Sequence, residues 1–221
     1  MASGTLNPYQ GDNDNNNYQY TGSGNWQARG FGGNDTLIGS AGNDSISGGG
    51  GNDSISGGGG KDSISGGDGD DSLTGSYGAD TLVGGNGNDI LTGAGDRGDT
   101  GINTLIGGKG NDFYNLDRTG SVQDIITENL NEGIDTVEVV LLSGRTPPTY
   151  NLGANLENLI LSGVYTYDLR QLDFNGTGNS LNNQITGNSG ANTLNGEAGD
   201  DTLRTYATVT RDRHPVTRLK S

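Results

Sequence analysis

Apolar side chains recur singly, every nine residues, along the central part of the chain. Each follows an acidic position by two residues, and polar residues or glycines fill the spaces between. A triplet such as Ser54-Ile55-Ser56 predicts a very short strand whose middle side chain points inward. One apolar residue in nine is too few for a compact core, so we expect a repeat protein whose units pack against their neighbours. The recurring apolar residues are Leu37, Ile46, Ile55, Ile64, Leu73, Leu82 and Leu91.

Glycine dominates the segments between the predicted strands. The unit at residues 48–56 has glycine at its first, second and fourth positions and aspartate at its sixth. Glycine adopts the positive φ that tight turns require, so each of these segments predicts a turn. Two strands and two turns complete one coil of 18 residues. Consecutive turns therefore fall on opposite edges of the coil, and only every second turn stacks directly.

The repeat continues through nine units. Seven units run without slippage, with sixth positions from Asp35 to Asp89. An eighth unit holds five extra residues, including Asp96 and Asp99, and a ninth restores the pattern at Asp112. The motif G-G-x-G-x-D-x-U-x, with U a large apolar residue, resembles the hemolysin-type or RTX calcium-binding nonapeptide. The resemblance implies an all-β fold, a parallel β-roll or β-solenoid with calcium ions between stacked Gly/Asp turns.

The turns offer the ligands that calcium prefers. Ca²⁺ takes carboxylate and carbonyl oxygens, and a glycine-rich turn that ends in aspartate supplies both. Up to six ions are expected, each between turns two repeats apart. The expected pairs are Asp35 with Asp53, Asp44 with Asp62, Asp53 with Asp71, Asp62 with Asp80, Asp71 with Asp89, and Asp89 with Asp112. The resemblance further implies one carboxylate and two turn carbonyls from each side, with carbonyls from Gly49, Gly51, Gly58, Gly60, Gly67, Gly69, Gly85 and Gly87.

The thin apolar row predicts that folding depends on the metal. Burying one such side chain contributes about 1.5 to 3 kcal/mol, whereas ordering one residue of backbone costs about 1 to 2 kcal/mol. With one apolar residue in nine, the balance is unfavourable. We therefore expect the array to be largely unfolded without calcium and to fold cooperatively on binding it.

Composition and charge narrow the class of function. The 27 acidic against 12 basic residues give a net charge of −15, which disfavours nucleic acid and anionic membranes as partners. There is no cysteine, so no thiolate metal site exists. The sole histidine is His214, and neither a zinc helix nor a Ser/His/Asp set can be assembled around it. We therefore expect a chain that is not an enzyme and has no membrane-inserting segment.

The flanks of the array are less regular. Strand-like segments and Pro147-Pro148 follow it, and a second array then has Asn183, Asn192 and Asp201 at its sixth positions. Asparagine keeps an oxygen but loses the charge, so these turns are expected to bind calcium weakly or to close through amide hydrogen bonds. Trp26 and Phe31 are expected to cover the open end of the first coil. The expected segments are 1–29, a polar cap or disordered segment; 30–115, the calcium-binding roll; 116–174, a solenoid extension with longer strands; 175–204, degenerate repeats; and 205–221, a basic tail.

Three roles fit this organisation. The leading one is a secreted, extracellular calcium-binding module that folds after export. Residues 1–7 lack a basic region and an apolar run, so export by a type I rather than a Sec route is expected. The alternatives are an accessory module of a larger secreted protease, lipase or epimerase, and an adhesin or surface-layer component that contacts glycans or a cell surface.

Overall fold

The fold consists of short parallel strands. The computed structural model describes residues 7–94, 101–118, 124–141, 149–163, 173–206 and 218–220, and these contain strands, turns and bends but no helix. The chain divides into two compact units, Met1–Tyr114 with Gly120–Gly133, and Asn115–Thr119 with Ile134–Ser221. The described residues accordingly contain no helix long and apolar enough to cross a membrane.

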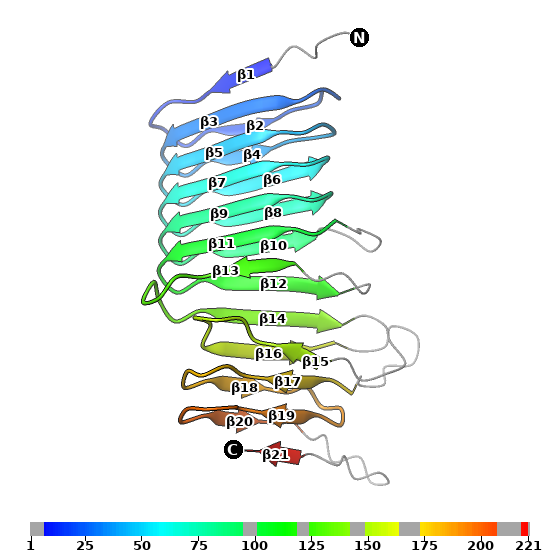
Figure 1. The fold of residues 1–221 in the computed structure, drawn as a ribbon. Coiled ribbons are helices and arrows are strands. Elements are labelled where there is room, and N and C mark those ends of the chain that lie inside the picture. The colour runs from blue at the N-terminus through cyan, green and yellow to red at the C-terminus, as the bar shows by residue number, and fades with distance from the viewer. Residues whose placement is uncertain are drawn as a thin grey trace. The chain divides into compact units, whose positions relative to one another are not determined.

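The first unit is a β-solenoid in which successive strands alternate between two parallel sheets (Figure 1). One sheet contains, in spatial order, β1 (Asn7–Gln10), β3 (Trp26–Gly32), β5 (Ser45–Gly50), β7 (Ser63–Asp68), β9 (Thr81–Asn86), β11 (Thr104–Lys109) and β13 (Ile125–Thr127). The other contains β2 (Asn17–Gln19), β4 (Thr36–Ile38), β6 (Ser54–Gly59), β8 (Ser72–Tyr77) and β10 (Ile90–Ala94). In this second sheet β10 is followed by β12 (Phe113–Arg118), whose first two residues belong to the first unit and whose others belong to the second.

The coil length predicted from the sequence is confirmed by the strand register. Ile46 lies opposite Ile64, and Ile55 opposite Leu73, so stacked residues are 18 apart. The inward side chains are buried, with Ile55 2% exposed and Leu73 fully covered. The strands are longer than expected, because β6 continues past Ser56 to Gly59. The ladder therefore includes the first glycines of each turn as well as the predicted triplet.

The five extra residues of the eighth unit leave the solenoid in register. Thr104 of β11 pairs with Thr81 of β9, and Leu105 pairs with Leu82. The separation of stacked residues rises by the length of the insertion, and the apolar row continues through Leu105, which is fully buried. Asp96 and Asp99 lie outside the described residues.

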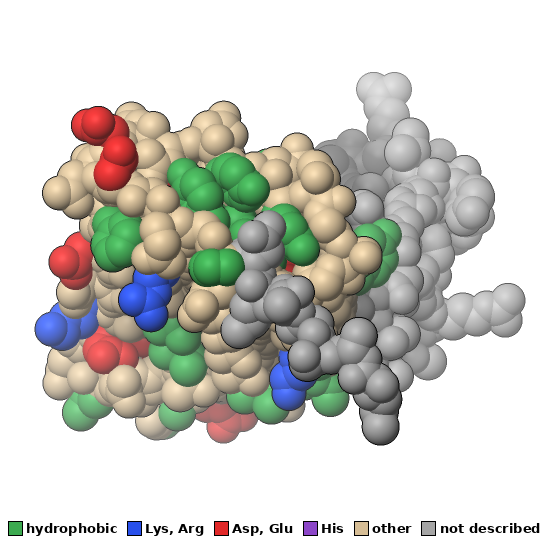
Figure 2. Space-filling model, turned by 90° about the horizontal axis from the view of Figure 1, so that it is seen from above, with side chains coloured by type: hydrophobic (Ala, Val, Ile, Leu, Met, Phe, Trp, Pro, Cys, Tyr) green, Lys and Arg blue, Asp and Glu red, His purple; other side chains and the backbone are tan. Residues whose placement is uncertain are grey.

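Aromatic side chains cover the first coil. Trp26 is fully buried, and the rings of Tyr18 and Tyr20 each stack on it with centroids 5.5 Å away. Tyr9 stacks on Tyr18 at 4.3 Å. Figure 2, which looks down on the β1 end of the molecule, shows hydrophobic side chains gathered on this face. The expectation that Phe31 helps to cover this end is wrong, because its side chain is 48% exposed and lies on the outer face of β3, beside Ser45 and Ser47 of β5.

The second unit is also built from parallel strands. One row contains β14 (Thr136–Leu141), β16 (Asn158–Ser162), β18 (Gln184–Thr186) and β20 (Thr202–Arg204), and the other β15 (Thr149–Asn151), β17 (Asn175–Thr177), β19 (Thr193–Asn195) and β21 (Arg218–Lys220). Its buried side chains include the aromatic groups of Tyr150 and Phe174. Part of the basic tail forms β21, whereas Pro147, Pro148 and His214 lie outside the described residues.

Candidate metal centres

Buried aspartates line both edges of the first unit. The eight predicted aspartates, which occupy the sixth position of their nine-residue units, are only 1% to 2% exposed. We call edge A the row Asp35, Asp53, Asp71, Asp89 and Asp112. We call edge B the row Asp44, Asp62, Asp80, Asn103 and Asp124. The strands on either side of each turn hold the backbone in place, so the carboxylates stack coil upon coil.

One oxygen of each stacked carboxylate is fixed by the backbone. The N–H of Asp35 donates to Oδ1 of Asp53 at 2.8 Å, and the N–H of Asp53 donates to Oδ1 of Asp71 at 2.7 Å. On edge B, the N–H of Asp62 donates to Oδ1 of Asp80 at 2.8 Å. The six expected aspartate pairs are therefore neighbours, including Asp89 with Asp112 across the insertion. These bonds orient the second oxygen of each group.

The second oxygen points into a space that only glycine leaves open. A Cβ added to Gly66 would lie within 3.0 Å of both Asp71 Oδ2 and the carbonyl oxygen of Gly84 in the next coil. The same holds for Gly84, beside Asp89 Oδ2 and the carbonyl oxygen of Gly107. A carboxylate oxygen and a carbonyl oxygen thus converge at each step, as a hard cation requires.

Several of these oxygens have no donor. In the part of the chain that the structure describes, the buried Oδ2 atoms of five aspartates accept no hydrogen bond. Buried polar groups are nearly always hydrogen-bonded, and an exception calls for a missing water or ion. A cation between the turns satisfies them, so the residues present fit calcium. The five are Asp35, Asp53, Asp62, Asp71 and Asp89.

The predicted carbonyl donors lie in the turns at positive φ. Their φ values run from +103° at Gly58 to +136° at Gly87, a region that side chains with a Cβ rarely adopt. They also stack closely, since a Cβ on Gly67 or Gly69 would lie within 3.0 Å of the carbonyl of Gly49 or Gly51. Glycine is therefore favoured twice, for conformation and for space, although Ser76 adopts a φ of +78° at the position that stacks on Gly58. The eight are Gly49, Gly51, Gly58, Gly60, Gly67, Gly69, Gly85 and Gly87.

Burial makes the ionised carboxylates costly. It raises the pKa of Asp62 and Asp71 to about 7, and neighbouring aspartates add to the effect. It raises the pKa of Asp89 and Asp112 to about 6. The exposed carboxylate of Asp70 contributes to the raised pKa of Asp71 and Asp89. At neutral pH each row therefore favours a bound cation or a proton.

One member of edge B, Asp124, was missed from the sequence. Asp124 Oδ1 accepts the N–H of Asn103 at 2.9 Å and its side-chain amide at 3.1 Å. Its Oδ2 lies within 3.0 Å of the Cβ position of Gly93. The sequence does contain a signal for Asp124, because Ile126 follows it by two residues, as an apolar residue follows each aspartate of the repeat. No glycine-rich turn precedes Asp124, so the repeat motif does not include it.

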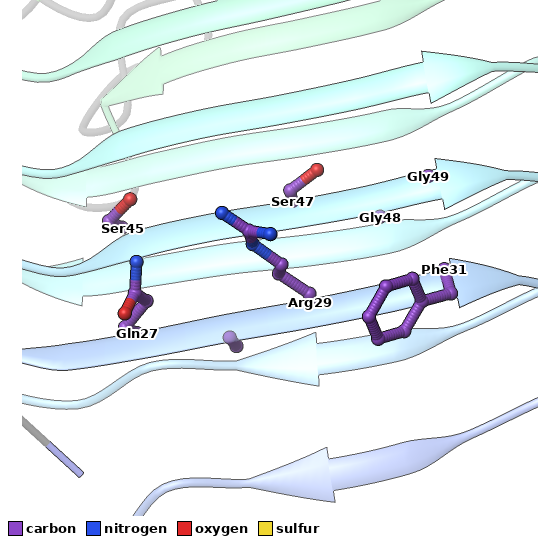
Figure 3. Close-up of a pocket in the computed structure, with 8 residues that line it drawn as sticks. Gln27, Arg29, Phe31, Ser45, Ser47, Gly48 and Gly49 are labelled. Carbon is purple, nitrogen blue, oxygen red and sulfur yellow. The ribbon is translucent and has the colours of Figure 1, made fainter. Parts of the chain in front are cut away.

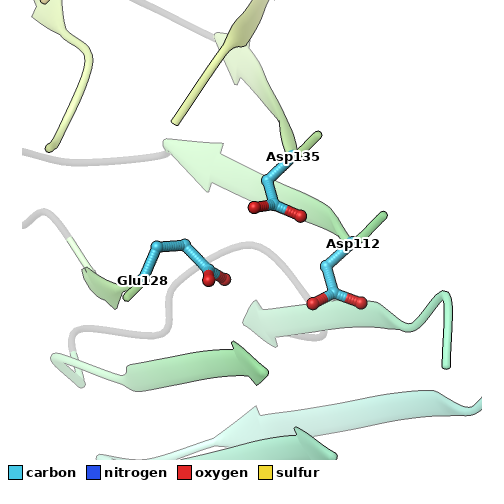
Figure 4. Close-up of side chains that lie close together, drawn as sticks. All are labelled: Asp112, Glu128 and Asp135. Carbon is cyan, nitrogen blue, oxygen red and sulfur yellow. The ribbon is translucent and has the colours of Figure 1, made fainter. Parts of the chain in front are cut away.

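A further acidic side chain lies near the end of edge A. Glu128 is 8% exposed, and one of its carboxylate oxygens lies within 4.8 Å of a carboxylate oxygen of Asp112 (Figure 4). The hydroxyl of Tyr114 donates to Glu128 Oε1 and accepts the N–H of Gly107 at 2.6 Å. Burial and the carboxylate of Glu128 raise the pKa of Tyr114 well above its usual value. This coil thus adds a carboxylate and a hydroxyl beside the last aspartate of edge A.

The second unit closes its turns with amides. Asn183 Nδ2 donates to the carbonyls of Leu156 and Glu157 at 3.1 and 3.2 Å. Asn192 Nδ2 donates to Asn188 Oδ1 at 2.8 Å. These bonds bear out the expected amide hydrogen bonds in the degenerate array.

Acidic residues also enter the turns of the second unit. Asp135 is 1% exposed, and its N–H donates to Glu157 Oε2 at 2.9 Å. The N–H of Asn183 donates to Oδ1 of Asp201 at 2.9 Å. Asp135 and Glu157 were not anticipated, although Asp135-Thr136-Val137 keeps the order of the repeat.

A parallel β-solenoid with buried carboxylates and positive-φ glycines in its turns defines a metal-binding repeat protein. The model of the RTX calcium-binding nonapeptide repeat matches the chain in four copies, at residues 29–64, 65–98, 97–118 and 177–206. Together these copies span more than half of the chain, which therefore belongs to this family. No match was found among curated proteins or among solved structures.

Proposed function

We propose that this chain is a calcium-triggered module of a secreted protein, without catalytic activity of its own. The observation that carries the proposal is the set of buried Oδ2 atoms that lack a donor on both edges of the solenoid. Bound calcium ions satisfy these oxygens and offset the repulsion within each row. RTX repeat proteins are generally exported by type I systems, and low calcium inside the cell keeps such a chain unfolded until it leaves.

Circular dichroism tests the proposal directly. Metal-stripped protein is expected to show little β signal at neutral pH, and calcium is expected to restore the signal cooperatively. Magnesium at the same concentration is the control, because it prefers a smaller octahedral shell and retains its waters. A β signal that is identical with and without calcium would contradict the proposal.

A groove on the outer face of β3 and β5 favours a second role, as an adhesin that binds saccharides. The groove has a volume of about 360 Å³ and is lined by Gln27, Arg29, Phe31, Ser45 and Ser47, among others (Figure 3). Phe31 offers an exposed ring, and Arg29 is exposed with no carboxylate partner among the described residues. An aromatic platform beside a cation and hydroxyls suits a sugar that carries a carboxylate.

A glycan array in the presence of calcium tests this second role. Binding to uronate-containing glycans that is lost in both Phe31→Gly and Arg29→Ser supports it. Ser65→Ala, on the same outer face but outside the groove, is the control. Absence of binding leaves the calcium-triggered module or an accessory module of a larger secreted enzyme, and the flanking reading frame distinguishes those two.

A further inference from the structure

The two edges of the first unit differ at the residue that precedes each buried aspartate. On edge A this fifth position always carries a side-chain oxygen, in Asn34, Asn52, Asp70, Asn88 and Asn111. The oxygens of the first four accept the N–H of the equivalent residue one coil later, at 2.9 Å for Asn52 to Asn34 and 2.7 Å for Asn88 to Asp70. An unbroken ladder of side-chain hydrogen bonds therefore braces every turn of edge A.

The corresponding ladder on edge B stops. The N–H of Asn43 donates to Asn25 Oδ1, and the N–H of Lys61 donates to Asn43 Oδ1, both at 2.9 Å. The next fifth positions are Lys61, Ala79 and Ile102, none of which has a side-chain oxygen. The later turns of edge B therefore lack the brace that their edge A counterparts have.

Among the residues that the structure describes, charge follows the same division. Edge A has the exposed carboxylates of Asp68 and Asp70 in its turns, and Asn86 Nδ2 donates to Asp68 Oδ1 at 2.7 Å. Edge B places the ammonium of Lys61 directly before Asp62, and its aspartate row contains the neutral Asn103. Lys109 lies in an edge A turn, where the carboxylates outnumber it.

Calcium affinity rises with the charge count and the rigidity of the ligands. We propose that the two edges form separate classes of calcium site, with edge A binding tightly and edge B binding only at higher calcium. This inference rests on the proposed calcium binding and adds an order to it. Edge A then acts as the nucleus that aligns the coils, and edge B completes the solenoid as calcium rises.

A matched pair of variants tests the inference. Asp71 on edge A and Asp62 on edge B are both 2% exposed, and Oδ1 of each accepts a backbone N–H at 2.7 to 2.8 Å. Asn103 already occupies an equivalent site, so Asp→Asn is compatible with the fold. Calcium titration calorimetry of the metal-stripped full chain at pH 7.5 is expected to give two classes of site, at least about tenfold apart in Kd.

The two variants should affect different classes. D71N is expected to remove tight sites, whereas D62N removes weak sites and leaves the tight class unchanged. A single class in the wild type, or equal losses in both variants, would overturn the inference. A wild type that binds no calcium would instead overturn the proposed function itself.

A third variant adds ligands rather than removing them. Lys61→Asn with Asn103→Asp gives edge B a side-chain oxygen at the fifth position before Asp62 and a carboxylate at its one neutral sixth position, while Ala79 and Ile102 stay unchanged. We expect the weak class to tighten several-fold while the tight class stays unchanged. A weak class that does not respond would also overturn the inference, and this outcome does not depend on how well the Asp→Asn variants fold.

Discussion

At the scale of single residues, the turns distinguish one glycine from the next. Gly58 has a φ of +103°, and a Cβ there would lie within 3.0 Å of the carbonyl oxygen of Ser40. Gly59, the next residue, has no positive φ, and its Cβ would meet the same oxygen only at 3.9 Å. Two adjacent glycines of one turn thus face different constraints.

These constraints predict different effects of the same substitution. Gly58→Ala is expected to lower the free energy of unfolding of the calcium-bound protein by at least about 2 kcal/mol, since it combines strain with a backbone clash. Gly59→Ala is the control and should change it by less than about 0.5 kcal/mol. Chemical denaturation in saturating calcium measures both, and equal losses would contradict this account of the turn.

Phe31 shows the reverse case, a bulky residue in a glycine position. Its φ is +80°, and it lies opposite Gly49 in the sheet. Left-handed backbone costs a side chain about 1 to 2 kcal/mol, and this offsets the burial of a ring that is 48% exposed. We expect Phe31→Gly to change the free energy of unfolding by less than about 1 kcal/mol, far below the roughly 3 to 5 kcal/mol of a core Phe→Ala change. Thermal unfolding in calcium checks this, with Leu73→Ala as the destabilising reference.

At the scale of elements, the aspartate rows couple the solenoid to pH as well as to calcium. The pKa of Asp62 and Asp71 is raised to about 7 in the folded chain, so the folded state binds protons more tightly than the unfolded state does. The resulting stability is fully present below the unfolded pKa near 4 and is lost as the pH rises through about 7. This is the opposite of the usual behaviour of a salt-bridged carboxylate.

Acidification is therefore expected to stabilise the metal-free array. Metal-stripped protein at low concentration should gain β signal in circular dichroism between pH 7.5 and pH 5. Asp62→Asn with Asp71→Asn is the control, because it removes two of the titrating groups and should flatten the response. A metal-free β signal that falls on acidification would contradict this prediction.

At the scale of the molecule, the two units rely on different turn chemistry. The first unit stacks buried carboxylates, whereas in the second unit the side-chain amides of Asn183 and Asn192 donate hydrogen bonds within the turns. The second unit also buries the aromatic side chains of Tyr150 and Phe174, and its degenerate turns have the neutral Asn183 and Asn192 in place of two of the aspartates. It should therefore depend less on the metal.

Hydrogen exchange in chelator tests this difference. The backbone N–H groups around Ile55 and Ile64 are expected to exchange rapidly without calcium, whereas those around Ile185 and Leu194 stay protected. Added calcium should restore protection in the first unit. Uniform loss of protection in both units would mean that a single calcium-dependent transition governs the whole chain.

Much of this protein follows from its sequence. The nine-residue period determined the coil, the inward apolar row and the pairing of aspartates such as Asp53 with Asp71, because strand geometry and chain continuity leave few alternatives. The same period identified the turn glycines, because glycine adopts positive φ without strain and leaves room for the carbonyl of the neighbouring coil. The family resemblance rests on these local features, and the family match confirms it.

Other features were decided only in three dimensions. The ladder of side-chain hydrogen bonds along edge A depends on which residues become neighbours after a full coil. The order of residues along the chain does not show that the N–H of Asn52 donates to Asn34 Oδ1. Nor does it show that the ladder of edge B ends at Lys61. Asp124 joins edge B although no glycine-rich turn precedes it, because the strand register brings it beside Asn103. The sequence by itself determined the repeat and its ligand chemistry. Stacking decided which oxygens converge, since hydrogen bonds between coils form only when residues distant in the chain lie one above the other.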